Sequence, residues 1–170
     1  GELEFVAMVT EEVPRAWLPV IRRMGYSVRP VKNPVELSEI KNREFAKDVV
    51  TDGATGITEL VKIDVFRWTE YHRVLLIDCD FLVRKNFDEI LEFEQTLGWT
   101  HGVWRGEFMN GGFFVVNPHN EGEKHYTAIA DIMREGDWRH CKTGCGWRGT
   151  VFGYVYGGRT IQGVLPYYFL

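Results

Sequence analysis

Two aspartates at the end of a short apolar run are the residues of this chain best suited to chemistry. From Val74 to Asp80 the chain reads Val-Leu-Leu-Ile-Asp-Cys-Asp, so four apolar residues lead directly into two carboxylates one residue apart. Such a run predicts a buried strand, and a strand that continues straight sends alternate side chains to one face. We therefore expect Asp78 and Asp80 to share a face at the strand end, where open α/β sheets hold ligands. Paired carboxylates suit Mg²⁺ or Mn²⁺, which often shares its shell with substrate phosphates.

An alternation of strands and helices precedes this strand and predicts the frame that positions it. Pro14 in the first turn and Gly25 at the end mark the boundaries of the first helix. The β-α-β unit formed in this way is expected to cross over in the right-handed sense. The predicted segments are a strand at 3–10, a helix at 13–24, a strand at 26–31, a long loop with room for a short helix at 32–56 and a helix at 57–68.

The chain after the acidic pair is predicted to add two helices, two short strands and a shaped loop. Asn86 can cap the first helix, and Asn110-Gly-Gly is a turn that leads into a short buried strand. The stretch 136–158 is rich in glycine and aromatic residues, which suits a loop shaped over a planar or sugar ligand. The first helix carries Phe87, Ile90, Leu91 and Leu97, the second spans 121–134, and the strands are 99–104 and 113–116.

Composition excludes several classes of protein. The chain has 170 residues, of which 45% are hydrophobic, enough for one globular domain with a sizeable core. Its 20 basic and 24 acidic residues give a formal charge of −4 and gather on no basic face, so we expect no nucleic-acid partner. No apolar run approaches the ~20 residues that a membrane span needs. Cys141 and Cys145 form a C-x3-C pair that could be a disulfide or two free thiols and has too few neighbouring ligands for zinc.

Four motifs follow one another in a specific order. A lysine-bearing helix, a strand that ends in D-x-D and an N-x-D-E helix occupy residues 62–91, and an Asn-Gly-Gly turn with the next strand occupies residues 109–118. In this order the chain resembles the glycogenin-like glycosyltransferases of family 8, over most of its length. The resemblance implies a GT-A fold, which is a Rossmann-like α/β domain with a mixed, mostly parallel sheet flanked by helices. Residues 1–170 would form one incomplete domain of this kind.

The resemblance also implies roles for individual residues. Asp78 and Asp80 match the aspartates that hold Mn²⁺, or Mg²⁺, against the diphosphate of a UDP-sugar. Lys62 matches the lysine that supports the departing charge, and Gln162 matches the glutamine of the family's G-G-D-Q-G segment, so these two are the expected catalytic residues. The donor site would be completed by the backbone of Cys79 and by the turn Asn110, Gly111 and Gly112.

The implied reaction transfers glucose or galactose, with retention of configuration, to an acceptor hydroxyl. A departing nucleotide diphosphate develops negative charge, which a metal ion and a nearby cation stabilise. The expected partners are a UDP-hexose donor and a carbohydrate or glycoprotein acceptor. A homodimer is left open, and so is the compartment, which could be the cytoplasm or the Golgi lumen.

The chain departs from the family pattern in three places. Ile161 stands where the family's glycine-rich segment has its aspartate, and no acidic residue follows Asp137. We therefore expect the acceptor-side acid to be missing or to come from elsewhere in the chain. The family's uridine-binding first strand and the histidine that completes its metal shell have no counterpart between Gly1 and Leu170, which predicts a domain truncated at both ends.

Two other functions stay open. A truncated or degenerate transferase could act as a non-catalytic binding or scaffold protein. Haloacid-dehalogenase-like phosphatases also have a strand that ends in D-x-D, but they place Thr or Val two residues after the second aspartate, where this chain has Leu82. They also usually begin with that strand, whereas two predicted strands precede it here, so this is the less favoured alternative.

Overall fold

The computed structural model of the chain describes residues 3–53, 55–102, 107–140, 145–154 and 156–170. The chain divides into two compact units, residues 1–33 and residues 34–170, and each is described by itself. Helices and strands occur in both units, so the predicted α/β class is confirmed.

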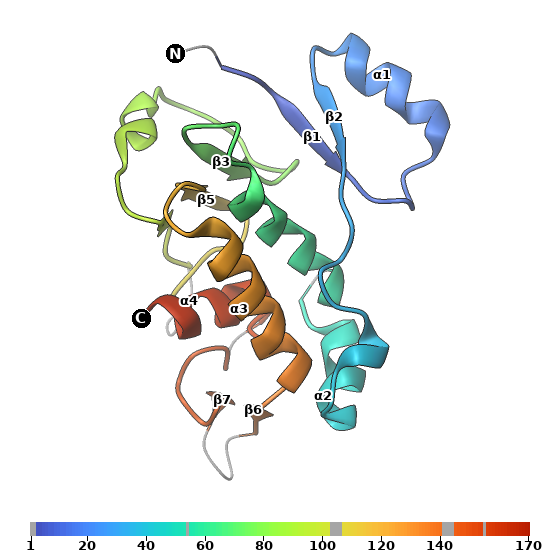
Figure 1. The fold of residues 1–170 in the computed structure, drawn as a ribbon, viewed down its shortest axis with the longest axis vertical. Helices are drawn as coiled ribbons and strands as arrows, with labels where there is room; N and C mark the ends of the chain where they lie inside the picture. Colours follow the sequence, from blue (N-terminus) through green and yellow to red (C-terminus); the bar gives the residue numbers. More distant parts are fainter. Residues whose placement is uncertain (1–2, 54, 103–106, 141–144, 155) are drawn as a thin grey trace. The chain divides into compact units, whose positions relative to one another are not determined.

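The first unit has the predicted order of strand, helix and strand. Strand β1 (Val6–Val9) and strand β2 (Ser27–Pro30) pair in parallel. Their connection contains a 3₁₀ turn, η1 (Arg15–Trp17), and helix α1 (Leu18–Arg23), drawn in blue in Figure 1. Gly25 has a φ of 93°, a left-handed conformation that glycine adopts without steric cost, and the helix ends just before it. The predicted β-α-β unit is confirmed.

The second unit contains the strand that leads into Asp78 and Asp80, together with most of the helices. Its central sheet has three strands in the order β3-β5-β4, and a second sheet has two strands, β6 and β7. The strands are β3 (Val74–Ile77), β4 (Leu97–Trp99), β5 (Phe113–Val116), β6 (Trp138–Arg139) and β7 (Gly146–Trp147). The α-helices are α2 (Arg43–Asp48), α3 (Gly122–Glu135) and α4 (Ile161–Phe169), and the 3₁₀ helices are η2 (Leu37–Glu39), η3 (Val49–Thr51), η4 (Gly56–Arg67) and η5 (Asp88–Glu92).

Strand β5 lies at the centre of the three-stranded sheet. It pairs antiparallel with β3 on one edge and with β4 on the other, and Ile77 lies opposite Phe113. All four of its residues are buried. A strand that is paired on both edges and covered on both faces needs a continuous apolar run, which is what Phe-Phe-Val-Val provides. The buried strand predicted over residues 113–116 is confirmed.

Helix η4 buries every third residue. The predicted helix over residues 57–68 is present, but it is a 3₁₀ helix, which has three residues per turn rather than 3.6. Val61, predicted to face the core, is therefore only half-buried, whereas Glu59 and Lys62 come to lie in one row three residues apart. The buried row consists of Ile57, Leu60, Ile63 and Phe66, each at most 8% exposed.

Helix α3 packs closely against η4. A Cβ atom on Gly122, the first residue of α3, would lie only 1.9 Å from the carbonyl oxygen of Phe66. The amphipathic pattern predicted for residues 121–134 is confirmed, because Ile129 and Met133 are fully buried. Figure 1 shows α3 running beside η4, with α4 against it.

The predicted mostly parallel sheet is not what the strands form. Among the described residues only β1 and β2 pair in parallel, while the pairs β3-β5, β4-β5 and β6-β7 are antiparallel. The physical reason is the connection between strands. A helical crossover joins β1 to β2, whereas the chain between β3 and β5 turns back through η5 and β4. The GT-A arrangement therefore stays a prediction.

Three local predictions also need correction. The helix predicted from Asn86 to Leu97 is the short 3₁₀ helix η5, and Leu97 begins strand β4. The cap predicted at Asn86 is also wrong, because the N-cap residue of η5 is Phe87 and it makes no side-chain cap hydrogen bond. The Oδ1 of Asn86 accepts a local hydrogen bond of 2.8 Å from the amide of Asp88. Helix α4 has no counterpart among the predicted helices, because Gly163 and Pro166 are poor helix formers.

In the part of the chain that the structure describes, no helix is long and apolar enough to cross a membrane. Cys79 is a free, exposed thiol, and Cys145 is disulfide-bonded. Cys141 lies outside the described residues, as do positions 103 and 104 of the predicted strand 99–104.

One histidine of the second unit lies in an aromatic environment that shifts its pKa. His125, on α3, packs against the rings of Phe66 and Phe169, and its Nδ1 lies 2.9 Å from the hydroxyl of Tyr168. Burial lowers the pKa of His125, because removal from water disfavours the charged imidazolium. The folded state therefore favours the neutral ring.

Mild acid is accordingly expected to destabilise the chain. The folded state binds this proton less readily than the unfolded chain, whose ordinary histidine pKa is 6.5. The stabilising contribution is therefore complete above that pH and is lost as the pH falls toward the lower pKa of the folded state. Thermal unfolding between about pH 7.5 and about pH 5 should show a falling midpoint, and His125→Phe should flatten the fall.

The control for this experiment is a histidine on the surface of the protein. His119 is exposed, so His119→Gln should keep the wild-type dependence of the unfolding midpoint on pH. Equal slopes in the wild-type, His119→Gln and His125→Phe chains would contradict the prediction.

Candidate functional site

Lys62 is the centre of a polar network in the second unit. Its Nζ lies 2.8 Å and 3.0 Å from the two carboxylate oxygens of Asp78, and 2.7 Å from Oε2 of Glu59. It also donates to the carbonyl oxygen of Gly111, at 3.1 Å. The lysine side chain is only 12% exposed, so these contacts replace water around the ammonium group. Lys62 thereby connects η4, the end of β3 and the turn before β5.

Asp78 and the Asn-Gly-Gly turn meet because β3 and β5 are neighbours. Asp78 follows β3 directly, and its amide donates to the carbonyl oxygen of Gly112, at 2.9 Å. The amide of Gly112 donates in turn to Oδ1 of Asn110, at 2.8 Å. A Cβ on Gly112 would lie 2.9 Å from Oδ2 of Asp78, so a larger residue would displace the carboxylate. Glycine at this position leaves room for the carboxylate beside Lys62.

Gln162 holds the same turn from the opposite side. It lies in the first turn of α4, and its Oε1 accepts a hydrogen bond of 3.1 Å from the amide of Gly111. Its Nε2 donates to the carbonyl oxygen of Tyr156, at 2.9 Å. Hydrogen bonds therefore run without interruption from Asp78 through Lys62 and Gly111 to Gln162.

Asp80 and Cys79 lie outside this network. Asp80 is exposed and makes no hydrogen bond or ion pair with any residue that the structure describes. Cys79 is likewise exposed, as a free thiol. The structure therefore brings together Lys62, Asp78, Gln162 and the turn 110–112, and it leaves Asp80 and Cys79 open to solvent.

The donor set fits a divalent cation only in part. Asp78 and Asp80 offer the hard oxygen ligands that Mg²⁺ and Mn²⁺ prefer. The described residues contain no group of three or more His, Cys, Asp or Glu side chains that could hold a metal ion. Two carboxylates alone would suit an ion that completes its shell with substrate oxygens and water.

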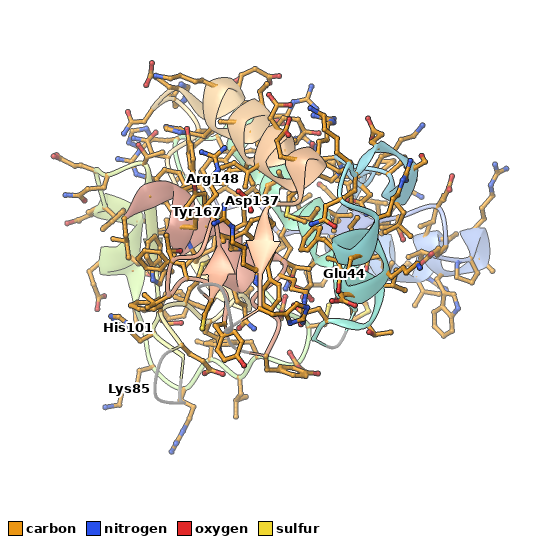
Figure 2. The ribbon with its side chains drawn as sticks, turned by 90° about the horizontal axis from the view of Figure 1, so that it is seen from below. Glu44, Lys85, His101, Asp137, Arg148 and Tyr167 are labelled. Atoms are coloured by element: carbon orange, nitrogen blue, oxygen red, sulfur yellow. The ribbon has the colours of Figure 1, made fainter. Side chains whose placement is uncertain are left out.

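A cleft opens in the segment that follows Asp80. It has a volume of about 610 Å³ and is lined by the residues from Phe81 to Phe87, together with Thr100 and Phe113. Phe81 and Phe113 stack with ring centroids 4.9 Å apart. Lys85, at the rim, projects away from the ribbon in Figure 2. The cleft offers space for a ligand beside the exposed carboxylate.

Two residues that support the network carry no signal in the sequence. Glu59 lies three residues before Lys62 on η4, a spacing that allows the ion pair but does not by itself mark Glu59 as part of a site. Asp52 is 7% exposed, and its carboxylate accepts hydrogen bonds from the amide (2.7 Å) and from Nη1 (3.0 Å) of Arg159, which is 107 residues away. A contact of that sequence separation leaves no local pattern.

Neither the family models nor the curated proteins that were compared with the sequence match it. The resemblance to the glycogenin-like glycosyltransferases therefore rests on the motifs and their order, and it stays a prediction.

Replacing Lys62 tests whether it holds the network together. Lys62→Met removes the ammonium from between Glu59 and Asp78 and leaves two carboxylates facing each other. We expect the free energy of unfolding, measured with urea, to fall by about 1–2 kcal/mol, since these groups are partly shielded from water.

The matched control is a lysine in an exposed ion pair. Lys41 pairs with Glu135 on the surface, where both side chains are at least half exposed. Lys41→Met should change the free energy of unfolding by less than about 0.5 kcal/mol. A Lys62→Met chain as stable as the wild type would show that the network is not a source of stability.

Proposed function

We propose that the chain is a metal-dependent, retaining glycosyltransferase of GT-A type that moves glucose or galactose from a UDP-hexose to an acceptor hydroxyl. The observation that carries the proposal is the network from Asp78 through Lys62 to Gln162, whose side chains come from three separate elements. A site for a diphosphate and a sugar needs carboxylates for a metal ion, a cation and a close approach of backbone. All three occur in this network or directly beside it.

Asp78 and Asp80 would hold Mn²⁺ or Mg²⁺, with diphosphate oxygens and water in the remaining positions. When bound, the ion supplies Lewis-acid stabilisation of the negative charge on the departing UDP. Asp80 is the carboxylate open for binding, because both oxygens of Asp78 are engaged by Lys62. Lys62 would then share Asp78 with the ion and turn part of its hydrogen-bonding capacity toward the diphosphate.

The Asn-Gly-Gly turn would contact the donor sugar. Gly111 and Gly112 lack side chains, so a ligand can approach their backbone closely. Asn110 uses its Oδ1 for the amide of Gly112, and its Nδ2 makes no hydrogen bond with a described residue. That amide group could donate to a sugar hydroxyl. Gln162 would fix the position of the turn through Gly111.

The proposed reaction exchanges one bond at the anomeric carbon for another. The bond from this carbon to the β-phosphate oxygen breaks, and a bond to the acceptor oxygen forms. The proton of the acceptor hydroxyl passes to the departing phosphate oxygen, so atoms and charges balance. Attack from the face that UDP leaves gives retention, and no residue is assigned the role of covalent nucleophile.

Binding of UDP and Mn²⁺ tests the proposal directly. Titration calorimetry of the wild-type chain should show UDP binding that depends on Mn²⁺. Asp80→Asn removes a carboxylate that makes no contact with other described residues, so it should spare the fold. It should weaken binding at least about tenfold, which is the effect of losing even an outer-shell partner of a metal site.

The control and the second measurement separate binding from catalysis. Asp131→Asn changes an exposed aspartate on α3 and should leave the affinity for UDP unchanged. Release of UDP from UDP-glucose or UDP-galactose would then identify an active enzyme and its donor. No binding at millimolar UDP, with or without Mn²⁺, would overturn the proposal and favour the scaffold alternative.

A further inference from the structure

A second group of polar and aromatic side chains surrounds Arg159, three residues before Gln162. None of its members belongs to the network described above. We call it the Asp48 cluster, and its members are Asp48 from α2, Trp138 from β6, and His140, Tyr154 and Arg159 from the segments between elements.

Arg159 is held in a fixed position within this cluster. The buried carboxylate of Asp52 accepts hydrogen bonds from the Arg159 amide, at 2.7 Å, and from its Nη1, at 3.0 Å. The guanidinium group also lies 4.0 Å from the centroid of the Trp138 ring. Asp52 balances the positive charge. Nη2 makes no hydrogen bond with a described residue, and Nε is buried without a hydrogen-bond partner among the described residues.

Asp48 leaves room for a bridging group on two sides. Its Oδ2 lies 3.8 Å from Nη2 of Arg159 and 3.6 Å from Nε2 of His140. Both distances exceed a direct hydrogen bond, and the Asp48 carboxylate makes none with any described residue. Gaps of this size commonly hold a hydroxyl or a water molecule. A ligand hydroxyl could donate to Asp48 and accept from Arg159.

An aromatic wall borders these polar groups. The rings of Trp138 and Tyr154 stack with centroids 6.3 Å apart and planes 17° apart, and His140 meets Trp138 edge-on at 5.0 Å. Trp138 is almost fully buried, but Tyr154 is 52% exposed and presents an open ring. A flat apolar surface beside a few fixed polar groups is the usual composition of a site that orients a small polar ligand, and the C–H face of a pyranose matches it.

We propose that the Asp48 cluster binds a neutral oligosaccharide. An anionic ligand would meet the carboxylate of Asp48, and a cationic ligand would meet the guanidinium of Arg159. A neutral polyol satisfies both, because each hydroxyl is a donor and an acceptor. The further assignment of this sugar as the acceptor rests on the proposed transferase function, and it is supported by the short distance in sequence from Arg159 to Gln162. Sugar binding itself is independent of that function.

The test measures sugar binding without the donor. Maltotriose, cellotriose and lactose are titrated separately into the wild-type chain, and binding is followed by saturation-transfer NMR. At least one of them should bind. Asp48→Asn removes the charged acceptor and Tyr154→Ala removes the ring, and each should weaken that binding about tenfold or more, since each removes one of the contacts that hold the sugar.

Two controls show that the effects are local. Val151→Ala changes an exposed side chain in the same segment as Tyr154, and Asp131→Asn changes an exposed aspartate on α3. Both should bind the sugar as the wild type does, and all variants should keep its thermal unfolding midpoint. Binding of sugar without binding of UDP would support the site and reject only its role as an acceptor site. No binding of any of the three sugars, or unchanged binding in Asp48→Asn and Tyr154→Ala, overturns the inference.

Discussion

The ion pair between Lys62 and Asp78 is the interaction that holds together the polar network of the second unit. Only 12% of the lysine side chain is exposed, and Glu59 and Asp78 place opposite charge beside it, at 2.7 Å and 2.8 Å. Two carboxylates against one ammonium leave a net negative charge, and the exposed Asp80 adds to it.

The register of the central sheet explains how this ion pair reaches the Asn-Gly-Gly turn. In an antiparallel pair the end of one strand lies beside the beginning of its partner. Asp78 follows β3 and Gly112 precedes β5, so the pairing of Ile77 with Phe113 places them side by side. If the same two strands were parallel, Asp78 at the end of β3 and the turn at the start of β5 would lie at opposite ends of the sheet. The feature in which the sheet differs from the predicted one is thus the feature that assembles the site.

Elements with a strong local signal could be predicted from the sequence. The apolar runs of β3 and β5 and the amphipathic stripe of α3 each identify a strand or helix by themselves. The order of motifs likewise selected Lys62, Asp78 and Gln162, which the structure joins. Strand direction could not be predicted, because it depends on the path of the connecting chain. Glu59 was not predicted, since its spacing of three residues from Lys62 is common on any helix and does not by itself indicate a site.

Asp52 shows most clearly why part of the site has no signature in the sequence. Its backbone carbonyl accepts a hydrogen bond from the amide of Gly56, at the start of η4, while its carboxylate holds Arg159, just before α4. One buried residue therefore anchors both the helix that carries Lys62 and the helix that carries Gln162. A buried carboxylate must find donors, and here it finds them 107 residues away. Asp52 thus links the start of η4 to the residue before α4 through contacts that lie outside both helices.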